Sequence, residues 1–423
     1  MTKSSSPARG LGRRALVASA LAAVSAARWA PVYAAAPAMK VAWISPQTGF
    51  LSSFGVTDRY VFETLGPRFR SGLQTASGDT RQVEISLHDA ASSPEKAAKL
   101  ATELIASGVH LILTTATPEI CNPVSDACEA AGVPCVSSIV PWQAWYYGRG
   151  ATATKGFEWT YHFFAGLEDF ADIYSALQAS ANLGTKTGGL FGDDIDAEAF
   201  LKAFPPAFAK RGIELVVPQR VQFANPDWES VAIQLRDANI RMVTGVLPPP
   251  IAAAFFQAAD KVGYKPVMAS IAKAFAFNDT VAQIQRPGLT LTNEVWWSPA
   301  WPFKSSFTGQ TAAKVVATYE ESTGAPWVQT LGFSHALMEV AAHVCQNTPS
   351  TKAADVRDTL KRARVNTLAG PINWRDSHPN RNVCTTPAVG GQWIRNAKGR
   401  WILEVVDNTR SPVIPTTAQL TTG

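Results

Sequence analysis

The sequence has little excess charge once its first 34 residues are set aside. Residues 1–34 hold five Lys and Arg residues and no acidic residue, and the remaining 33 basic residues equal the 33 Asp and Glu of the rest of the chain. A neutral body lacks the basic surface that binding to nucleic acid or to an anionic membrane requires. The overall charge of +5 therefore does not indicate a nucleic-acid partner.

Long apolar runs are also missing. The uncharged stretch Ala15–Ala27 is too short for a membrane span, which needs about 20 residues. Basic residues precede it and the small-residue signal Val32-Tyr33-Ala34 follows it, so residues 1–34 are predicted to be an export signal peptide. Arg13-Arg14 slightly favours the twin-arginine route. We expect a periplasmic protein with no membrane-inserted segment and no lipid anchor.

Motifs of common enzymes are absent. The glycines after the first expected strand lack dinucleotide-binding spacing, and the sequence has no phosphate-binding loop, no H-E-x-x-H and no G-x-S-x-G. His335, Glu339 and His343 share one face of an expected helix, but their neighbours are those of an ordinary amphipathic helix and no further ligand is evident. We therefore expect no catalysis, no cofactor and no metal.

Five cysteines allow an exported chain two disulfides and one remaining thiol. Cys128–Cys135 is the feasible local pair and Cys345–Cys384 the feasible distant pair. Cys121 is unsuited to Cys128, because the expected helix between them would hold them about 10 Å apart. Free buried thiols are an equally good interpretation.

Strands and helices alternate in the first part of the chain. Val41–Ile44, Val83–Leu87 and Val109–Leu113 are short apolar runs typical of buried strands. Ser93-Pro94 begins a helix, with serine as the N-cap and proline in the first turn, and Gly108 ends it. This order predicts a β-α-β unit.

The alternation continues to about residue 268. Further strands are expected near residues 133–136, 189–191, 215–217, 242–243 and 267–268, and further helices near 123–132, 196–210, 226–237 and 250–261. Asn225-Pro226 repeats the capping pattern at the start of one of these helices. Two successive series predict an α/β protein with two parallel sheets, each covered by helices on both faces.

Short segments along the mature chain resemble, in their order, the periplasmic solute-binding proteins that serve ABC importers of branched-chain amino acids, amides and aromatic acids. These segments are Ser45–Gly49, Phe54-Gly55, His88-Asp89, Ala97–Gly108, Pro123–Asp126, Ala131–Pro134, Asp227-Trp228, Gly263-Tyr264 and Gly370–Trp374. The resemblance implies the type I periplasmic binding fold: two doubly wound parallel-sheet lobes joined by three crossovers, with the ligand in the cleft.

The same resemblance implies the division of the chain and its partners. One lobe would hold residues 37–160 and 298–368, and the other residues 161–297 and 369–423. A monomeric, non-enzymatic receptor would bind a small-molecule ligand and deliver it to a membrane permease. The alternatives are a sensing subunit that signals to a membrane receptor and, less favoured, an exported α/β enzyme.

Loops at the carboxyl ends of parallel strands are where such folds bind ligands. In the first lobe these loops offer backbone amides and hydroxyls that suit a carboxylate, with aromatic side chains for an apolar body. The residues are Thr115, Ala116, Thr117, Ser137 and Ser138, together with Phe54 and Trp142. Helix capping is as good an explanation for any single hydroxyl.

The second-lobe loop Ala269–Lys273 departs from the resemblance. In the family's amino-acid binders this loop supplies an acid for the ligand's ammonium group, whereas here it has a lysine and no acid. We expect Lys273 and Asp194 to close over the ligand. An aromatic or apolar carboxylate is thus favoured over a branched-chain amino acid or amide, unless Glu168 or Asp194 pairs with an ammonium group. A solvated Lys273 is the other interpretation.

Overall fold

The computed structural model describes residues 1–4 and 38–422. The predicted signal peptide falls almost wholly outside these residues and stays a prediction. Residues Ala38–Gly423 form one unit, and the fold described below is that of this unit. No helix in the described ranges is long and apolar enough to cross a membrane.

Six parallel strands make up the first sheet, in the order β16-β7-β6-β5-β1-β4. Their bounds are β1 Met39–Ser45, β4 Val83–Asp89, β5 Leu111–Thr115, β6 Cys135–Ser138, β7 Thr160–Phe163 and β16 Val383–Cys384. The central strand β5 is buried along its whole length. Such continuous apolar strands are typical of a parallel sheet that is covered on both faces.

The second sheet has the order β10-β8-β11-β12-β13-β17-β18, and β9 also pairs with β8. Its bounds are β8 Lys186–Gly192, β9 Glu214–Val216, β10 Arg220–Val221, β11 Met242–Leu247, β12 Met268–Lys273, β13 Thr290–Val295, β17 Val389–Arg395 and β18 Trp401–Asp407. Strands β17 and β18 pair antiparallel at one edge. Two small hairpins complete the strands: β2 Leu73–Gln74 with β3 Thr80–Arg81, and β14 Arg364–Thr367 with β15 Gly370–Asn373.

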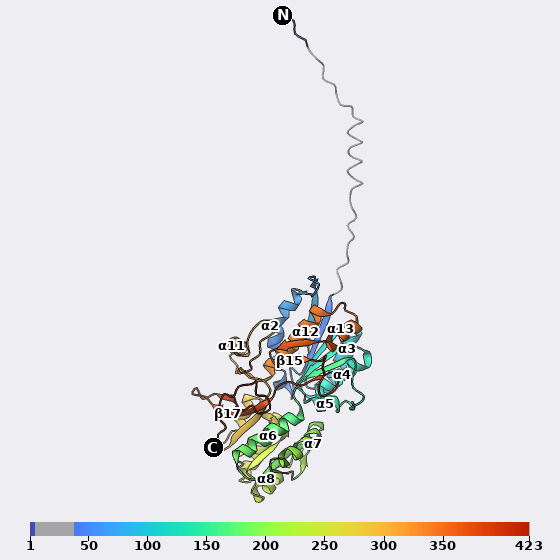
Figure 1. Cartoon of the computed structure of the whole chain (residues 1–423). Coiled ribbons are helices and arrows are strands. Elements are labelled where there is room, and N and C mark those ends of the chain that lie inside the picture. The colour runs from blue at the N-terminus through green and yellow to red at the C-terminus, as the bar shows by residue number, and fades with distance from the viewer. Residues whose placement is uncertain (5–37, 423) are drawn as a thin grey trace. The chain divides into compact units, whose positions relative to one another are not determined.

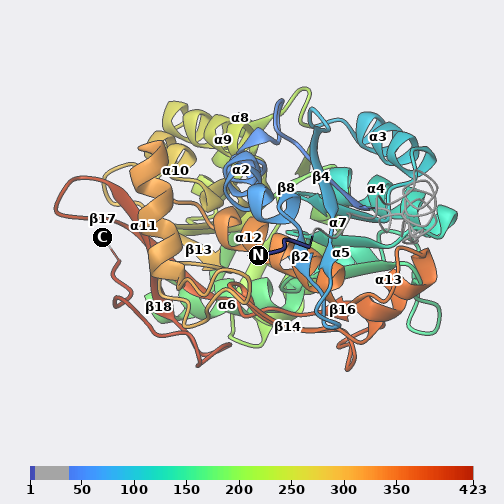
Figure 2. The same cartoon turned by 90° about the horizontal axis from the view of Figure 1, so that it is seen from above.

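Helices pack against each of the two sheets, as Figures 1 and 2 show for the labelled elements. Their bounds are α2 Asp58–Arg70, α3 Pro94–Ala106, α4 Pro118–Ala131, α5 Trp142–Tyr146, α6 Leu167–Ala181, α7 Ile195–Ala209, α8 Trp228–Asp237, α9 Pro249–Lys261, α10 Asn278–Ile284, α11 Ala312–Thr323, α12 Thr330–Asn347 and α13 Ala353–Lys361, with short 3-10 helices η1 Ser52–Phe54 and η2 Ala274–Ala276. In Figure 1, α3, α4, α5 and α12 gather in one half of the body and α6, α7 and α8 in the other.

Local capping signals explain where helices begin and end. Ser93 caps α3 by accepting a hydrogen bond from the backbone of Lys96, as expected. Gly132 adopts a left-handed φ of 69° at the end of α4, also as expected. That helix begins at Pro118, five residues earlier than predicted, because this proline already occupies its first turn.

The predicted start of α8 was wrong by two residues. Asp227, rather than Asn225, caps the helix by accepting a hydrogen bond from the backbone of Ser230. Proline at 226 therefore precedes the cap instead of opening the first turn. The Asp227 carboxylate accepts a hydrogen bond from a backbone N–H in the first turn that would otherwise be free, and the helix therefore begins after Asp227 instead of after Asn225.

The chain passes between the two sheets more than once. It leaves the first sheet after β7, builds the second from β8 to β13, returns to the first-sheet half with α12, pairs β16 beside β7, and ends in β17 and β18 of the second sheet. The exact lobe boundaries, at residues 160, 297 and 368, stay a prediction.

All five cysteines are buried free thiols. The two disulfides considered from the sequence, Cys128–Cys135 and Cys345–Cys384, are not formed. Cys128 and Cys135 are nevertheless neighbours, and the hydrogen bond between their thiols together with burial raises the pKa of Cys128. The Sγ of Cys384 instead accepts a hydrogen bond from the backbone of Asn373. The thiols thus pack as small apolar side chains.

Candidate functional site

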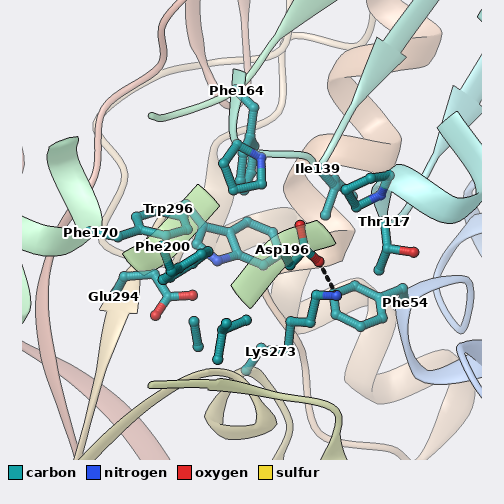
Figure 3. Close-up of a pocket in the computed structure, with 15 residues that line it drawn as sticks. Phe54, Thr117, Ile139, Phe164, Phe170, Asp196, Phe200, Lys273, Glu294 and Trp296 are labelled. Atoms are coloured by element: carbon teal, nitrogen blue, oxygen red, sulfur yellow. Dashed lines mark ion pairs between the residues drawn. The ribbon is translucent and has the colours of Figure 1, made fainter. Parts of the chain in front are cut away.

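A narrow cavity lies between the carboxyl ends of the strands of the two sheets, where open α/β folds place their ligands. The space between the residues that line it, including the part open to solvent, is about 440 Å³, and Figure 3 shows its walls. From the first-sheet side it is lined by Phe54, Thr117, Pro118, Ile139, Pro141 and Phe164, and from the second-sheet side by Phe170, Asp196, Phe200, Val246, Ala272, Lys273, Ala276, Glu294 and Trp296.

Three residues at strand ends around this cavity have left-handed backbone conformations although none is glycine. Ala116 follows β5 with a φ of 101°, Ile139 follows β6 with a φ of 64°, and Lys273 ends β12 with a φ of 65°. Such conformations cost about 1–3 kcal/mol each and cluster at functional sites. Here they turn the chain sharply and bring Thr117 and Lys273 to the cavity wall.

A buried ion pair joins Lys273 and Asp196 inside the cavity (Figure 3). The Lys273 ammonium also lies 3.8 Å from Oε1 of Glu119. Exposed fractions are 13% for the Lys273 side chain, 2% for Asp196 and 33% for Glu119. Asp196 stands in the first turn of α7 and Glu119 in the first turn of α4, where the helix dipole favours a carboxylate.

Burial and charge act in opposite directions on these groups. Burial raises the pKa of Asp196 to about 6, although the ammonium of Lys273 opposes the shift. Burial by itself would lower the pKa of Lys273, but Asp196 and Glu119 outweigh it and the pKa is raised. Lys273 therefore stays charged, and its charge is already balanced by protein carboxylates.

Glu294, near the end of β13, is a third carboxyl group at the cavity. It is 3% exposed, and the hydroxyl of Tyr174 donates a hydrogen bond to it. Burial raises the pKa of Glu294 to about 7. Near neutral pH this carboxyl group is thus divided between its neutral and ionised forms.

Aromatic rings from both sides form the rest of the wall. The Phe164 ring, directly after β7, packs edge-on against Trp296, directly after β13, with ring centroids 5.3 Å apart. Phe170 connects Phe164 to Phe200 at centroid distances of 6.1 and 6.3 Å. Such a wall suits a flat or branched apolar body.

Of the residues predicted from the sequence, Phe54, Thr117 and Lys273 line the cavity. The Thr117 hydroxyl is buried, and no described residue forms a hydrogen bond of good geometry with it. Ala116 shapes the wall through its backbone turn. Contact of any of these residues with a ligand stays a prediction.

The other predicted hydroxyls form hydrogen bonds within the first-sheet half of the body. Thr115 donates a hydrogen bond of 2.8 Å to the carboxylate of Asp58. Ser137 and Ser138 donate to the carbonyl oxygens of Tyr161 and Phe163, at 3.2 and 2.6 Å. These three side chains join neighbouring elements and do not line the cavity.

Trp142 and Asp194 flank the cavity without lining it. The indole of Trp142 donates a hydrogen bond of 2.9 Å to Glu168, and Asp194 caps α7 by accepting one of 2.7 Å from the backbone of Ala197. The acid beside Lys273 is therefore Asp196, two residues after Asp194. Its position in the first turn after β8 was the signal that sequence reasoning missed.

His335 and Glu339 have a structural role. The His335 Nδ1 lies 3.2 Å from Oε2 of Glu339, and the same carboxylate accepts hydrogen bonds from the backbones of Ser306 and Leu368. Within the described ranges no group of three His, Cys, Asp or Glu residues is arranged to hold a metal ion.

Two largely parallel sheets thus form a cavity with aromatic walls at the place where open α/β folds bind ligands. A family model described as periplasmic binding protein matches residues 38–392. The chain belongs to this family of binding proteins. No curated protein matches the chain.

Solved structures share the fold at low identity. A leucine-binding protein from Thermotoga maritima superposes with a TM-score of 0.72 at 16% identity, over 88% of this chain and 99% of its own. Solute-binding proteins of ABC transporters from Rhodopseudomonas palustris, solved with 3,4-dihydroxybenzoic acid and with 4-hydroxybenzoate, both give 0.70, at 17% and 16% identity, over 89% of this chain and 99% and 100% of theirs. The predicted fold class, that of type I periplasmic binding proteins, is confirmed.

Proposed function

We propose that the protein is the periplasmic receptor of an ABC importer and that it traps a small organic solute with an aromatic or other apolar body. The observation that carries this proposal is the cavity itself, which is lined by aromatic rings and charged groups from both halves of the body. Export by the predicted signal peptide and delivery to a membrane permease are parts of the same proposal.

The apolar body is the better supported half of the ligand. Phe54, Phe164 and Trp296 present rings from both sides of the cavity, and burying a ring of this size contributes about 1.5–3 kcal/mol. Two structural neighbours were solved with hydroxylated benzoates and one is a leucine-binding protein. The two bound benzoates and the leucine-binding neighbour make an apolar body of benzene or isobutyl size the first choice for testing.

The charge of the ligand's polar group does not follow from Lys273 alone. The sequence favoured a carboxylate because the loop Ala269–Lys273 offers a lysine and no acid for a ligand's ammonium group, yet Asp196 and Glu119 already pair with Lys273. Aromatic carboxylates, amides, amines and amino acids therefore all belong in the test.

The test is a thermal-shift screen of the purified protein against these four classes, followed by calorimetry. A ligand at about 100 times its Kd stabilises the folded state by about 2.7 kcal/mol, so one class should raise the Tm clearly. Absence of a shift in every class would overturn the receptor proposal. Turnover of a bound compound would also overturn it in favour of an enzyme.

A further inference from the structure

The cavity holds more acid than base. Asp196 and Glu294 line it, and Glu119 reaches the same ammonium group as Asp196. Among the described residues that line the cavity, Lys273 is the only cation. With all these groups ionised the site has two negative charges in excess, and with Glu294 neutral it still has one. Buried negative charge without a partner is costly.

Two carboxylate oxygens at this site lack hydrogen-bond donors among the described residues. They are Oδ1 of Asp196 and Oε2 of Glu119, although the Thr117 hydroxyl lies near enough to Glu119 to help lower the pKa of that carboxyl group. Asp196 is 1% exposed, and in Figure 3 one of its oxygens faces Lys273 while the other points away from it. An ionised carboxylate only accepts hydrogen bonds, so the missing partner of each oxygen is a donor.

A ligand carboxylate would find few donors here. Thr115, Ser137 and Ser138 give their hydroxyl protons to other groups of the first-sheet half, and Lys273 is paired with acids. Thr117 is the one first-sheet hydroxyl that lines the cavity in the described structure. A carboxylate would therefore add negative charge and unpaired acceptors to a site that already has both.

We propose that the ligand is an organic monocation: an aromatic or apolar body that carries a primary or secondary ammonium group and no carboxylate. This inference rests on the proposed receptor function. The ammonium supplies N–H donors to Asp196 and Glu119 and balances the excess charge. The rings of Phe54 and Trp296 also favour a cation, because the face of an aromatic ring attracts positive charge.

A matched set of probes with one phenylethyl body tests this assignment by calorimetry at pH 7.5. The set is 2-phenylethylamine, its N,N,N-trimethylammonium analogue, 2-phenylethanol, 3-phenylpropanoate and phenylalanine; indole and isobutyl sets repeat the comparison. The primary amine should bind at least tenfold more tightly than every other member of its set. The trimethyl analogue keeps the charge but has no N–H, so it isolates the hydrogen-bond requirement.

Every other result of this probe comparison overturns one stated part of the inference. Tighter binding of the carboxylate or the amino acid in any set overturns the cation assignment and leaves the receptor proposal standing. Equal binding of the trimethyl analogue overturns the N–H requirement. Absence of binding by every member of the three sets and of the wider screen overturns the inference and the receptor proposal together.

The Asp196→Asn variant tests whether Asp196 is the acceptor of the ligand's ammonium group. Amine affinity should fall by at least tenfold and by a larger factor than the affinity for 2-phenylethanol, because the alcohol can lose a hydrogen bond to Asp196 but no charge interaction. Glu198→Gln is the matched control, because Glu198 is an exposed acid on the same helix and pairs with Lys202. Equal loss in the two variants, or none in Asp196→Asn, would overturn the role of Asp196.

A pH titration of the unaltered protein gives a second test that does not depend on a variant's folding. Asp196 faces Lys273 of β12 and Glu119 of α4, with Asp194 nearby on its own segment. Its pKa of about 6 predicts that amine affinity falls about tenfold between pH 7.5 and pH 5, as protonation removes the acceptor charge. Glu294, whose pKa is raised to about 7, also titrates in this pH range. The pH dependence of amine affinity that remains in the Asp196→Asn variant measures the contribution of Glu294. Constant affinity would overturn the inference.

Discussion

The side chains of Glu119 and Lys273 approach within 3.8 Å (Oε1 to Nζ) although they come from elements of different sheets. Glu119 stands at the start of α4 beside the first sheet, and Lys273 ends β12 of the second. In the proposed receptor, a separation of the two halves that admits a ligand would break this contact. The pair would then link ligand binding to closure of the cavity.

Glu119→Gln is expected to weaken that link modestly. Because Glu119 is one-third exposed, the contribution of the contact is about 1 kcal/mol or less, and ligand affinity should fall by about two- to fivefold. Calorimetry measures the change, and small-angle scattering with and without ligand measures closure. Unchanged affinity with unchanged scattering would mean that the contact has no part in closing the cavity.

Phe54→Ala tests the apolar wall, with Phe50→Ala as its control. Phe54 is 4% exposed, lines the cavity and packs edge-on against Phe277 at 4.9 Å, whereas Phe50 is 53% exposed on the same loop. Affinity for the ligand should fall more than tenfold in the first variant, about 1.4 kcal/mol, and less than twofold in the second. Similar effects in both variants would contradict the assignment of Phe54 to the ligand wall.

Lys273→Ala separates the two candidate charges of the ligand. If the ligand carries a carboxylate toward this loop, affinity should fall more than tenfold; if the ligand is a cation, affinity should stay the same or rise, since repulsion is removed. The measurement is calorimetry at two salt concentrations. For a carboxylate ligand, unchanged affinity and salt dependence would exclude Lys273 as its partner.

The fold was largely predictable because its signals are local. Apolar runs, the Ser93 cap and the Gly132 turn mark β-α-β units regardless of their surroundings. The site was less predictable, because side chains of one strand alternate between its two faces. Position at a strand end pointed to Thr117 and Lys273, which line the cavity, but it could not show that Ser138 bonds to a neighbouring backbone carbonyl.

The charge balance of the cavity was hidden for a related reason. Asp196 and Lys273 are 77 positions apart in the sequence, and only the pairing of β8 and β12 on either side of β11 brings their segments together. A local reading of the loop before Lys273 therefore sees a lysine without an acid. The tertiary contact with Asp196 reverses the expectation for the ligand's polar end.

The buried carboxyl group of Asp58 predicts a pH dependence of stability in the first-sheet half. Asp58 opens α2, is fully buried, and accepts hydrogen bonds from Thr115 at 2.8 Å and Ser334 at 2.5 Å. Burial outweighs these hydrogen bonds and raises its pKa to about 6. Because the folded-state pKa lies above the unfolded value of about 3.9, the favourable contribution is complete below about pH 4 and is lost as the pH rises through 6.

Asp58→Asn should remove this part of the pH dependence. A shift of about two pKa units corresponds to a free energy on the order of 3 kcal/mol, so the unaltered protein should lose stability between pH 4 and pH 8 relative to the variant. Denaturant unfolding of both proteins at several pH values measures the difference, with Asp79→Asn as an exposed control. Parallel curves for Asp58→Asn and the unaltered protein would mean that Asp58 is ionised at a normal pKa, stabilised by its hydrogen bonds and the start of α2. A gap that grows between about pH 4 and pH 6, levels off above pH 6 and is absent from the Asp79 control would assign the effect to the buried carboxyl group.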